Sequence, residues 1–98
     1  MAFIQIIEFH TDDIDGIRQA GEEYEAQVAD DNLVRRRVIT QDRNDPSRHL
    51  LMVFFDSYES AMENSNRPET SAIAEKMASL VDGPPTFHDL DVVDDRSY

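Results

Sequence analysis

Ala2–Phe9 (AFIQIIEF) and Leu50–Phe55 (LLMVFF) are the two stretches that decide the fold of this chain. Both are short, rich in branched and aromatic residues, and apolar at odd as well as even positions. Successive side chains of a strand point to opposite faces, so a half-exposed strand alternates apolar with polar residues. A strand that is apolar on both faces expects cover on both. The two stretches therefore predict strands of a sheet that is covered on each side.

Length and composition indicate one small domain. The chain has 98 residues and no cysteine, which excludes a disulfide framework, a thiol nucleophile and any cysteine-based metal site. The first residues carry no basic leader pattern, and no apolar run approaches the roughly 20 residues that a membrane span needs. We expect a soluble, cytoplasmic protein.

The net charge of −12 narrows the range of partners. Lys and Arg supply most of the affinity of proteins for nucleic acids, and this acidic surface would repel a phosphate backbone. Anionic membranes are disfavoured for the same reason. We therefore expect neither a nucleic-acid nor a membrane partner. The acidity favours solubility, and docking of a basic partner is the alternative.

Hydrophobic spacing and capping residues predict the remaining elements. Apolar residues recur at spacings of three and four after His10-Thr11-Asp12-Asp13, whose side-chain oxygens suit a helix start. Asp56-Ser57-Tyr58-Glu59 resembles a capping sequence, and Pro68 suits the first turn of a further helix. The predicted order is strand 2–9, helix 13–29, strand 33–40, loop 41–48, strand 50–55, helix 57–65, a helix from Pro68 that ends at Gly83, and strand 86–93.

This order predicts the architecture. Both strand–helix–strand crossovers must be right-handed, which places both helical segments on the same face of the sheet. We expect an α+β, ferredoxin-like, four-stranded antiparallel sheet over residues 1–93, with helices on one face and a polar tail over residues 94–98. The helix-free face is too apolar for an ordinary monomer surface. A homodimer that pairs two such faces is the simplest closure.

The stretch Val53–Glu69 (VFFDSYESAMENSNRPE) carries a family resemblance. Together with the strand order and length, it resembles the dimeric α+β barrel superfamily, close to its antibiotic-biosynthesis-monooxygenase-like branch. The resemblance implies a homodimeric barrel with a pocket in each subunit between sheet and helices. Known members are cofactor-independent oxygenases of phenolic polycycles, haem-degrading enzymes, small isomerases and proteins of unassigned function. The matching residues are Phe55, Asp56, Ser57, Glu59, Ala61 and Pro68.

The sequence departs from two branches of that superfamily. Haem-degrading members use a helical His and a Trp, whereas this chain has no Trp and has Asn64 and Ile73 in those places. Haem degradation is therefore disfavoured, and we expect no cofactor. Oxygenase members place Asn, Trp, Tyr and Arg around a phenol. Only the Asn carries over by resemblance, to Asn64.

His10 is the candidate catalytic base. It ends the first strand next to two acids, and its unperturbed pKa lies near neutrality, which suits proton abstraction from a phenol or enol. A surface histidine at a strand–helix junction is the alternative. His49 and His88 lack the helical spacing of a ligand pair, so no metal site is predicted.

Three further residues are candidate ligand contacts: Tyr24, Arg36 and Asn64. Tyr24 belongs to the apolar helix stripe and needs a partner for its hydroxyl. Asn64 either helps to end its helix or orients a ligand carbonyl. In Arg35–Arg37, either Arg36 or the other two point toward a covered surface. They would bind an oxyanion there, or form ion pairs with Glu8, Asp89 or Asp91.

Three functions stay open. The first is a cofactor-independent monooxygenase or isomerase of a small hydrophobic or phenolic metabolite, with His10 as base. The second is a non-catalytic module that binds a small hydrophobic ligand. The third is a structural homodimer with a filled pocket. A cavity of about 300 Å³ or more with polar groups favours the first two, and a solid core excludes both.

Overall fold

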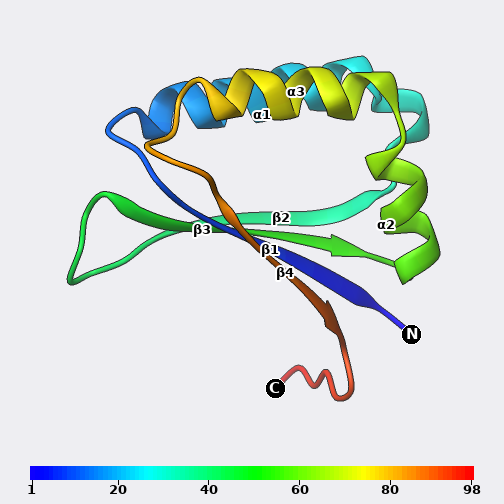
Figure 1. Cartoon of the computed structure of the whole chain (residues 1–98). Helices are drawn as coiled ribbons and strands as arrows, with labels where there is room; N and C mark the ends of the chain where they lie inside the picture. The colour runs from blue at the N-terminus through cyan, green and yellow to red at the C-terminus, as the bar shows by residue number, and fades with distance from the viewer.

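Four antiparallel strands form one sheet in the computed structural model, which describes residues 1–98. The sheet order is β2-β3-β1-β4; α1 and α3 cover one face of it, α2 lies at one end of the sheet, and no helix covers the other face (Figure 1). The predicted α+β ferredoxin-like sheet with helices on one face is confirmed. The elements are β1 (Phe3–His10), α1 (Ile14–Gln27), the 3-10 helix η1 (Ala29–Asp31), β2 (Val34–Gln41), β3 (Arg48–Phe55), α2 (Tyr58–Ser65), α3 (Pro68–Ala78) and β4 (Thr86–Asp91).

Side-chain caps fix where the helices begin. The Asp13 carboxylate accepts a hydrogen bond of 2.9 Å from the backbone N–H of Gly16 at the start of α1. Helix α2 is capped by Ser57, which forms a capping box with Ser60. The sequence suggested Asp56, one residue earlier, as the cap. That acid, Asp56, instead binds Arg35 from β2. The Ser57 hydroxyl therefore caps α2, and the Asp56 carboxylate forms an ion pair with the edge strand β2.

The helix-covered face of the sheet carries the core. Strand pairing places Phe3, Gln5, Ile7 and Phe9 of β1 on this face, opposite Phe55, Val53, Leu51 and His49 of β3. Two buried clusters result. One contains Phe3, Phe55 and Ala61, and the other contains Phe9, Ile17 and Leu51.

The alternate side chains of the same strands form the helix-free face. Half of the residues on this face are apolar, so β1 and β3 carry apolar side chains on both faces, as predicted. The polar half, by pairing register, is Glu8, His10, Arg36, Thr40, Arg48, Thr86 and His88. Leu90 on it is 43% exposed. At one end of the face, Arg48 binds Glu8 at 3.1 Å. The apolar members, by pairing register, are Ile4, Ile6, Val38, Leu50, Met52, Phe54 and Leu90.

A β-bulge in β2 determines which face of the sheet each of the three consecutive arginines lies on. Val34 pairs with Phe55 and Arg36 with Phe54, so Arg35 is the extra residue and the expected alternation is broken. Arg36 lies on the helix-free face, 5.3 Å from the centre of the Phe54 ring. Arg37 lies on the helix-covered face. The expected carboxylate partners from other strands were wrong, because Arg35 and Arg37 pair with Asp56 and Glu25.

The helices are all short. The longest, α1, has 14 residues, and none of them is long and apolar enough to cross a bilayer.

Candidate functional site

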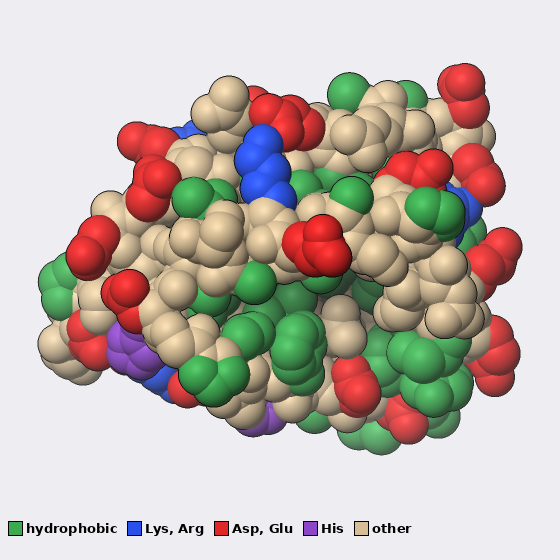
Figure 2. All heavy atoms as spheres, turned by 45° about the horizontal axis from the view of Figure 1, so that its top comes forward, with side chains coloured by type: hydrophobic (Ala, Val, Ile, Leu, Met, Phe, Trp, Pro, Cys, Tyr) green, Lys and Arg blue, Asp and Glu red, His purple; other side chains and the backbone are tan.

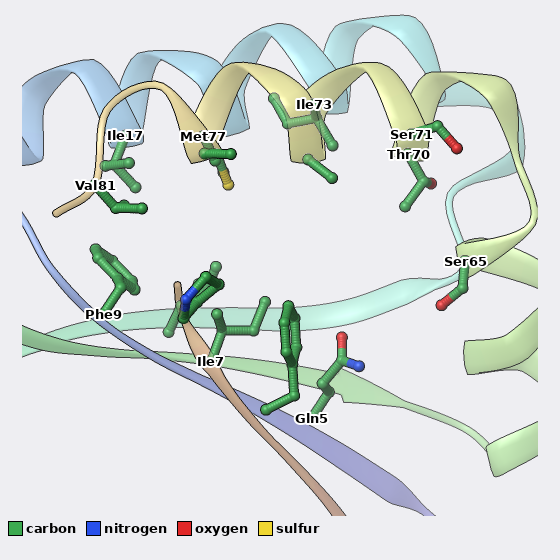
Figure 3. Close-up of a pocket in the computed structure, with 15 residues that line it drawn as sticks. Gln5, Ile7, Phe9, Ile17, Ser65, Thr70, Ser71, Ile73, Met77 and Val81 are labelled. Carbon is green, nitrogen blue, oxygen red and sulfur yellow. The ribbon is translucent and has the colours of Figure 1, made fainter. Parts of the chain in front are cut away.

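A cavity of about 330 Å³ lies between α3 and the helix-covered face of the sheet. Figure 2 shows hydrophobic side chains gathered in a hollow beneath the helical layer, with acidic side chains around it. In Figure 3, Ile73 and Met77 point from α3 toward Ile7 and Phe9 of β1. We call this cavity the apolar chamber. Its lining residues are Gln5, Ile7, Phe9, Ile17, Leu51, Ser65, Thr70, Ser71, Ile73, Ala74, Met77, Ala78, Val81, Pro85 and Phe87.

A second cavity of about 120 Å³ adjoins the first. The two share six lining residues, so they are neighbouring hollows separated at most by shared side chains, and hydrophobic residues make up most of both linings. We call the second cavity the polar chamber, because Tyr24, Glu25, Asn32, Arg37 and Asn64 line it. The shared residues are Gln5, Ile7, Leu51, Thr70, Ile73 and Met77. The core is therefore hollow, and its size and polar groups meet the criterion for an enzyme or a binding module.

Tyr24, Asn64 and Thr70 meet in the polar chamber. The Tyr24 hydroxyl donates to Oδ1 of Asn64 at 2.6 Å and lies 2.9 Å from the Thr70 hydroxyl. The phenol has one proton, so Thr70 is the donor in the second bond. Asn64 is only 7% exposed. Its side-chain oxygen is occupied by Tyr24, which leaves the amide N–H groups for another acceptor.

Arg37 is the positive charge of the polar chamber. Its guanidinium lies 3.5 Å from the Glu25 carboxylate of α1, and its side chain is 25% exposed. Gly21, one turn before Glu25, makes room for it, because a Cβ at that position would overlap the Arg37 Nη1 atom. A guanidinium and an amide thus line the same small volume.

The structure separates the predicted site residues into two groups. Tyr24 and Asn64 lie together in the polar chamber, whereas Arg36 lies on the opposite face of the sheet. His10 also lies on the helix-free face. It follows Phe9, which lies on the covered face, and it pairs with Arg48 of β3. Its Nδ1 atom is 3.1 Å from the Ser47 hydroxyl and 3.9 Å from Asp45. His10 lines neither chamber, and its role as a base stays a prediction.

The groups whose pKa departs from the ordinary value lie outside the chambers, at the β2–β3 loop. Backbone N–H of Asn44 and the Arg48 guanidinium lower the pKa of Asp42. The Ser47 hydroxyl and backbone N–H lower the pKa of Asp45. No group of three or more His, Cys, Asp or Glu side chains is arranged to hold a metal ion.

Buried His49 has a fixed orientation at the same end of the sheet. Its Nδ1 atom lies 3.1 Å from the Thr40 carbonyl, which can only accept, so Nδ1 carries the proton. The ring stacks on Phe9, with centroids 5.6 Å apart. His49 is therefore a packed core residue whose donor is satisfied.

Sequence reasoning missed Thr70 and Gln5, both of which line the two chambers. Thr70 follows Pro68 in the first turn of α3 and carries no sequence signal, because its partner Tyr24 is 46 residues away. Gln5 had a signal, since it interrupts the apolar run of β1 on the covered face. Gly21 likewise stands where the helical stripe calls for a larger apolar residue.

The fold has known relatives, although no protein-family model and no curated protein matches the sequence. A Nitrosomonas europaea protein, named provisionally as an antibiotic biosynthesis monooxygenase, matches 94% of this chain and 90% of its own, with a TM-score of 0.75 and 15% identity. Rv0793 from Mycobacterium tuberculosis matches 99% and 100% of the chains, with a TM-score of 0.77 and 14% identity.

SnoaB from Streptomyces nogalater, a cofactor-independent oxygenase, is similar at a TM-score of 0.78 and 8% identity, over 96% of this chain and 95% of its own. At such identities the likeness concerns the fold. This chain has the fold of the antibiotic biosynthesis monooxygenase proteins.

Proposed function

We propose that this protein is a cofactor-independent enzyme, a monooxygenase or isomerase, that acts on a small hydrophobic or phenolic metabolite in the two chambers. The observation that carries the proposal is a pair of adjoining cavities, an apolar one of about 330 Å³ and a smaller one that holds the cluster of Tyr24, Asn64 and Thr70. A structural domain with a filled pocket would have a solid core at this place. The name of SnoaB as a cofactor-independent oxygenase agrees with the proposal.

The proposed chemistry begins with loss of a proton from a phenol or an activated C–H group. The resulting anion is electron-rich and reduces dioxygen directly. In the monooxygenase reaction one oxygen atom enters the substrate as a carbonyl, and the other leaves as water with two substrate protons. The Asn64 N–H groups would donate to the substrate oxygen as charge develops on it, which is the usual way in which such anions are stabilised.

Oxygen consumption with a phenolic anthrone as the probe tests this proposal. The wild-type protein should accelerate oxygen uptake without added metal or flavin and incorporate one labelled atom from ¹⁸O₂. Asn64→Asp, which replaces the amide donors by a carboxylate, should lower the rate by about a hundredfold or more. Asn66→Asp makes the same change at an exposed position and is the matched control. No acceleration by the wild-type protein over buffer would contradict the oxygenase assignment.

A non-catalytic binding module is the second candidate. The same hollow favours it, since the apolar chamber is large enough for a drug-sized ring system. Saturable binding of the anthrone without product would favour this candidate. His10→Ala tests His10 as the base, a role that its position outside both chambers does not support. Loss of turnover in this variant would support His10, and retained turnover would remove it from the mechanism.

We also propose that two copies pair through the helix-free face, in the cytoplasm. The support is the apolar set of Ile4, Ile6, Met52, Phe54 and Leu90 on a face that no helix covers (Figure 1). A second copy offers the same surface, so an isologous interface would cover the exposed apolar residues of both copies. The chambers lie on the other side of the sheet, between it and the helices.

A further inference from the structure

We propose that Arg37 anchors an acidic group of the ligand, so that the natural ligand is an organic anion: an apolar ring body with one carboxylate or phenolate. This inference rests on the proposed function, since it needs a ligand in the chambers. Beyond the proposed function, it specifies that the ligand is negatively charged and that Arg37 selects this charge.

The hydrogen-bonding state of Arg37 is the first support. Its contact with Glu25 spans 3.5 Å, which is longer than a normal N–H···O hydrogen bond of about 2.7–3.2 Å. Glu25 is half exposed, so this ion pair is weak. A guanidinium has five N–H donors in a planar fork that matches a carboxylate. Arg37 therefore presents unused donors to the polar chamber.

The room around Arg37 is the second support. Gly21 lies on the buried side of α1, where a helix ordinarily carries an apolar side chain, and the guanidinium occupies the space of the missing Cβ. Glycine in a helix interior destabilises the helix relative to alanine. The chain thus uses a residue that weakens α1 at the one position that admits the arginine.

The position of Arg37 relative to the apolar chamber is the third support. Ile73 and Met77 line both chambers, so a ring packed beneath α3 lies next to the polar chamber. The net charge of −12 repels anions from the surface in general. Selection of an anion must then come from a local cation, and Arg37 is the only Lys or Arg that lines the two chambers.

A matched pair of fluorescent probes tests the inference. 1-Anilinonaphthalene-8-sulfonate carries an apolar ring body with one anionic group, and N-phenyl-1-naphthylamine has the same body without the charge. The wild-type protein should bind the sulfonate more tightly than the neutral amine. Arg37→Gln should weaken the sulfonate about tenfold or more and leave the neutral amine unchanged, because a charge-assisted hydrogen bond is lost.

Three further variants separate anion recognition from a structural role. Gly21→Ala should weaken the sulfonate alone, because the new methyl group displaces the guanidinium. Glu25→Gln should strengthen it, because Arg37 loses its competing carboxylate, whereas a purely structural ion pair would predict no gain. Arg35→Gln removes the same charge two residues earlier, at an exposed ion pair with Asp56, and should change neither probe.

The outcomes distinguish this inference from the function on which it rests. Equal affinity of the wild-type protein for the two probes, or equal loss of both in Arg37→Gln, overturns anion selection and leaves the open chambers standing. Failure of the wild-type protein to bind either probe overturns both proposals. Ala74→Trp narrows the apolar chamber and should weaken both probes, and undiminished binding would show that the chambers are not where the probes bind.

Discussion

The Tyr24 hydroxyl connects all three helices through one oxygen atom. Tyr24 belongs to α1, Asn64 to α2 and Thr70 to α3, and both of its partners lie within 2.9 Å. Sequence reasoning identified Tyr24 and Asn64 one by one, as a core ring with a polar tip and as a late helical amide. Their hydrogen bond spans 40 residues and depends on how α2 packs, which no local pattern describes.

We expect Tyr24→Phe to lower the free energy of unfolding by about 1–3 kcal/mol. The ring still fills its place, but Asn64 Oδ1 is left without a donor in a site that is 7% exposed. Urea unfolding followed by circular dichroism measures the change. Tyr58→Phe is the control, because Tyr58 is 49% exposed and contacts Phe3 through its ring. A Tyr24→Phe loss no larger than that of the control would show that water replaces the hydroxyl.

At the scale of elements, the β2–β3 loop depends on two carboxylates. The Asp42 carboxylate accepts from the Asn44 backbone N–H at 2.8 Å and from Arg48 at 3.0 Å, and Asp45 accepts from the Ser47 backbone and hydroxyl. These bonds lower both pKa values below the ordinary 3.8. A carboxyl group with a lowered folded-state pKa stabilises the fold fully above its unfolded pKa, and this contribution is lost as pH falls through the folded value.

Asp42→Asn should therefore be less stable than the wild-type protein at neutral pH, and the difference should shrink as the pH falls below 3.8. The melting temperature of both proteins, measured from neutral to acid pH, checks this. Asp95→Asn removes the same charge in the C-terminal tail and should follow the wild-type curve. A difference between Asp42→Asn and wild type that stays constant with pH would contradict the role of ionised Asp42.

The elements themselves were predictable because their signals are local. Strands β1 and β3 follow from their apolar runs, α1 from its stripe of apolar residues, and the start of α3 from Pro68. The bulge at Arg35 was not predictable, since Leu33–Thr40 (LVRRRVIT) reads as a regular strand. Only pairing with Phe54 and Phe55 decides which arginine faces the chambers. The sequence alone therefore indicates Arg36 as a ligand contact and leaves the orientation of Arg37 open.

At the scale of the whole molecule, the proposed dimer brings together two chains that each carry a charge of −12. Mutual repulsion opposes association and is screened by salt. We expect sedimentation to show dimers whose dissociation constant falls as ionic strength rises. Dissociation that is unchanged or promoted by salt would contradict this balance between an apolar interface and repulsion of net charge.

Met52→Glu should convert the protein into folded monomers, with at least a roughly hundredfold weaker association. Met52 pairs with Ile6 and Val38 at the centre of the helix-free face, so the interface would enclose an unpaired charge. Ala72→Glu introduces the same charge on α3, outside both chambers, and is the control for sedimentation. An unchanged dimer in Met52→Glu would place the interface elsewhere.

Helix α3 has no fully buried side chain, whereas α1 buries Ile17, Ala20 and Gly21. Met77 of α3 packs against the core, but the rest of the apolar face of this helix stands over a hollow, so less contact energy opposes local opening of α3 than of α1. Backbone amides of α3 should exchange with deuterium faster than those of α1, and bound anilinonaphthalene sulfonate should slow α3 selectively. Equal exchange in both helices would contradict this. Helix α3 would then be a separate local unfolding unit with less protection from exchange than α1, and a bound ligand would supply the packing that it lacks.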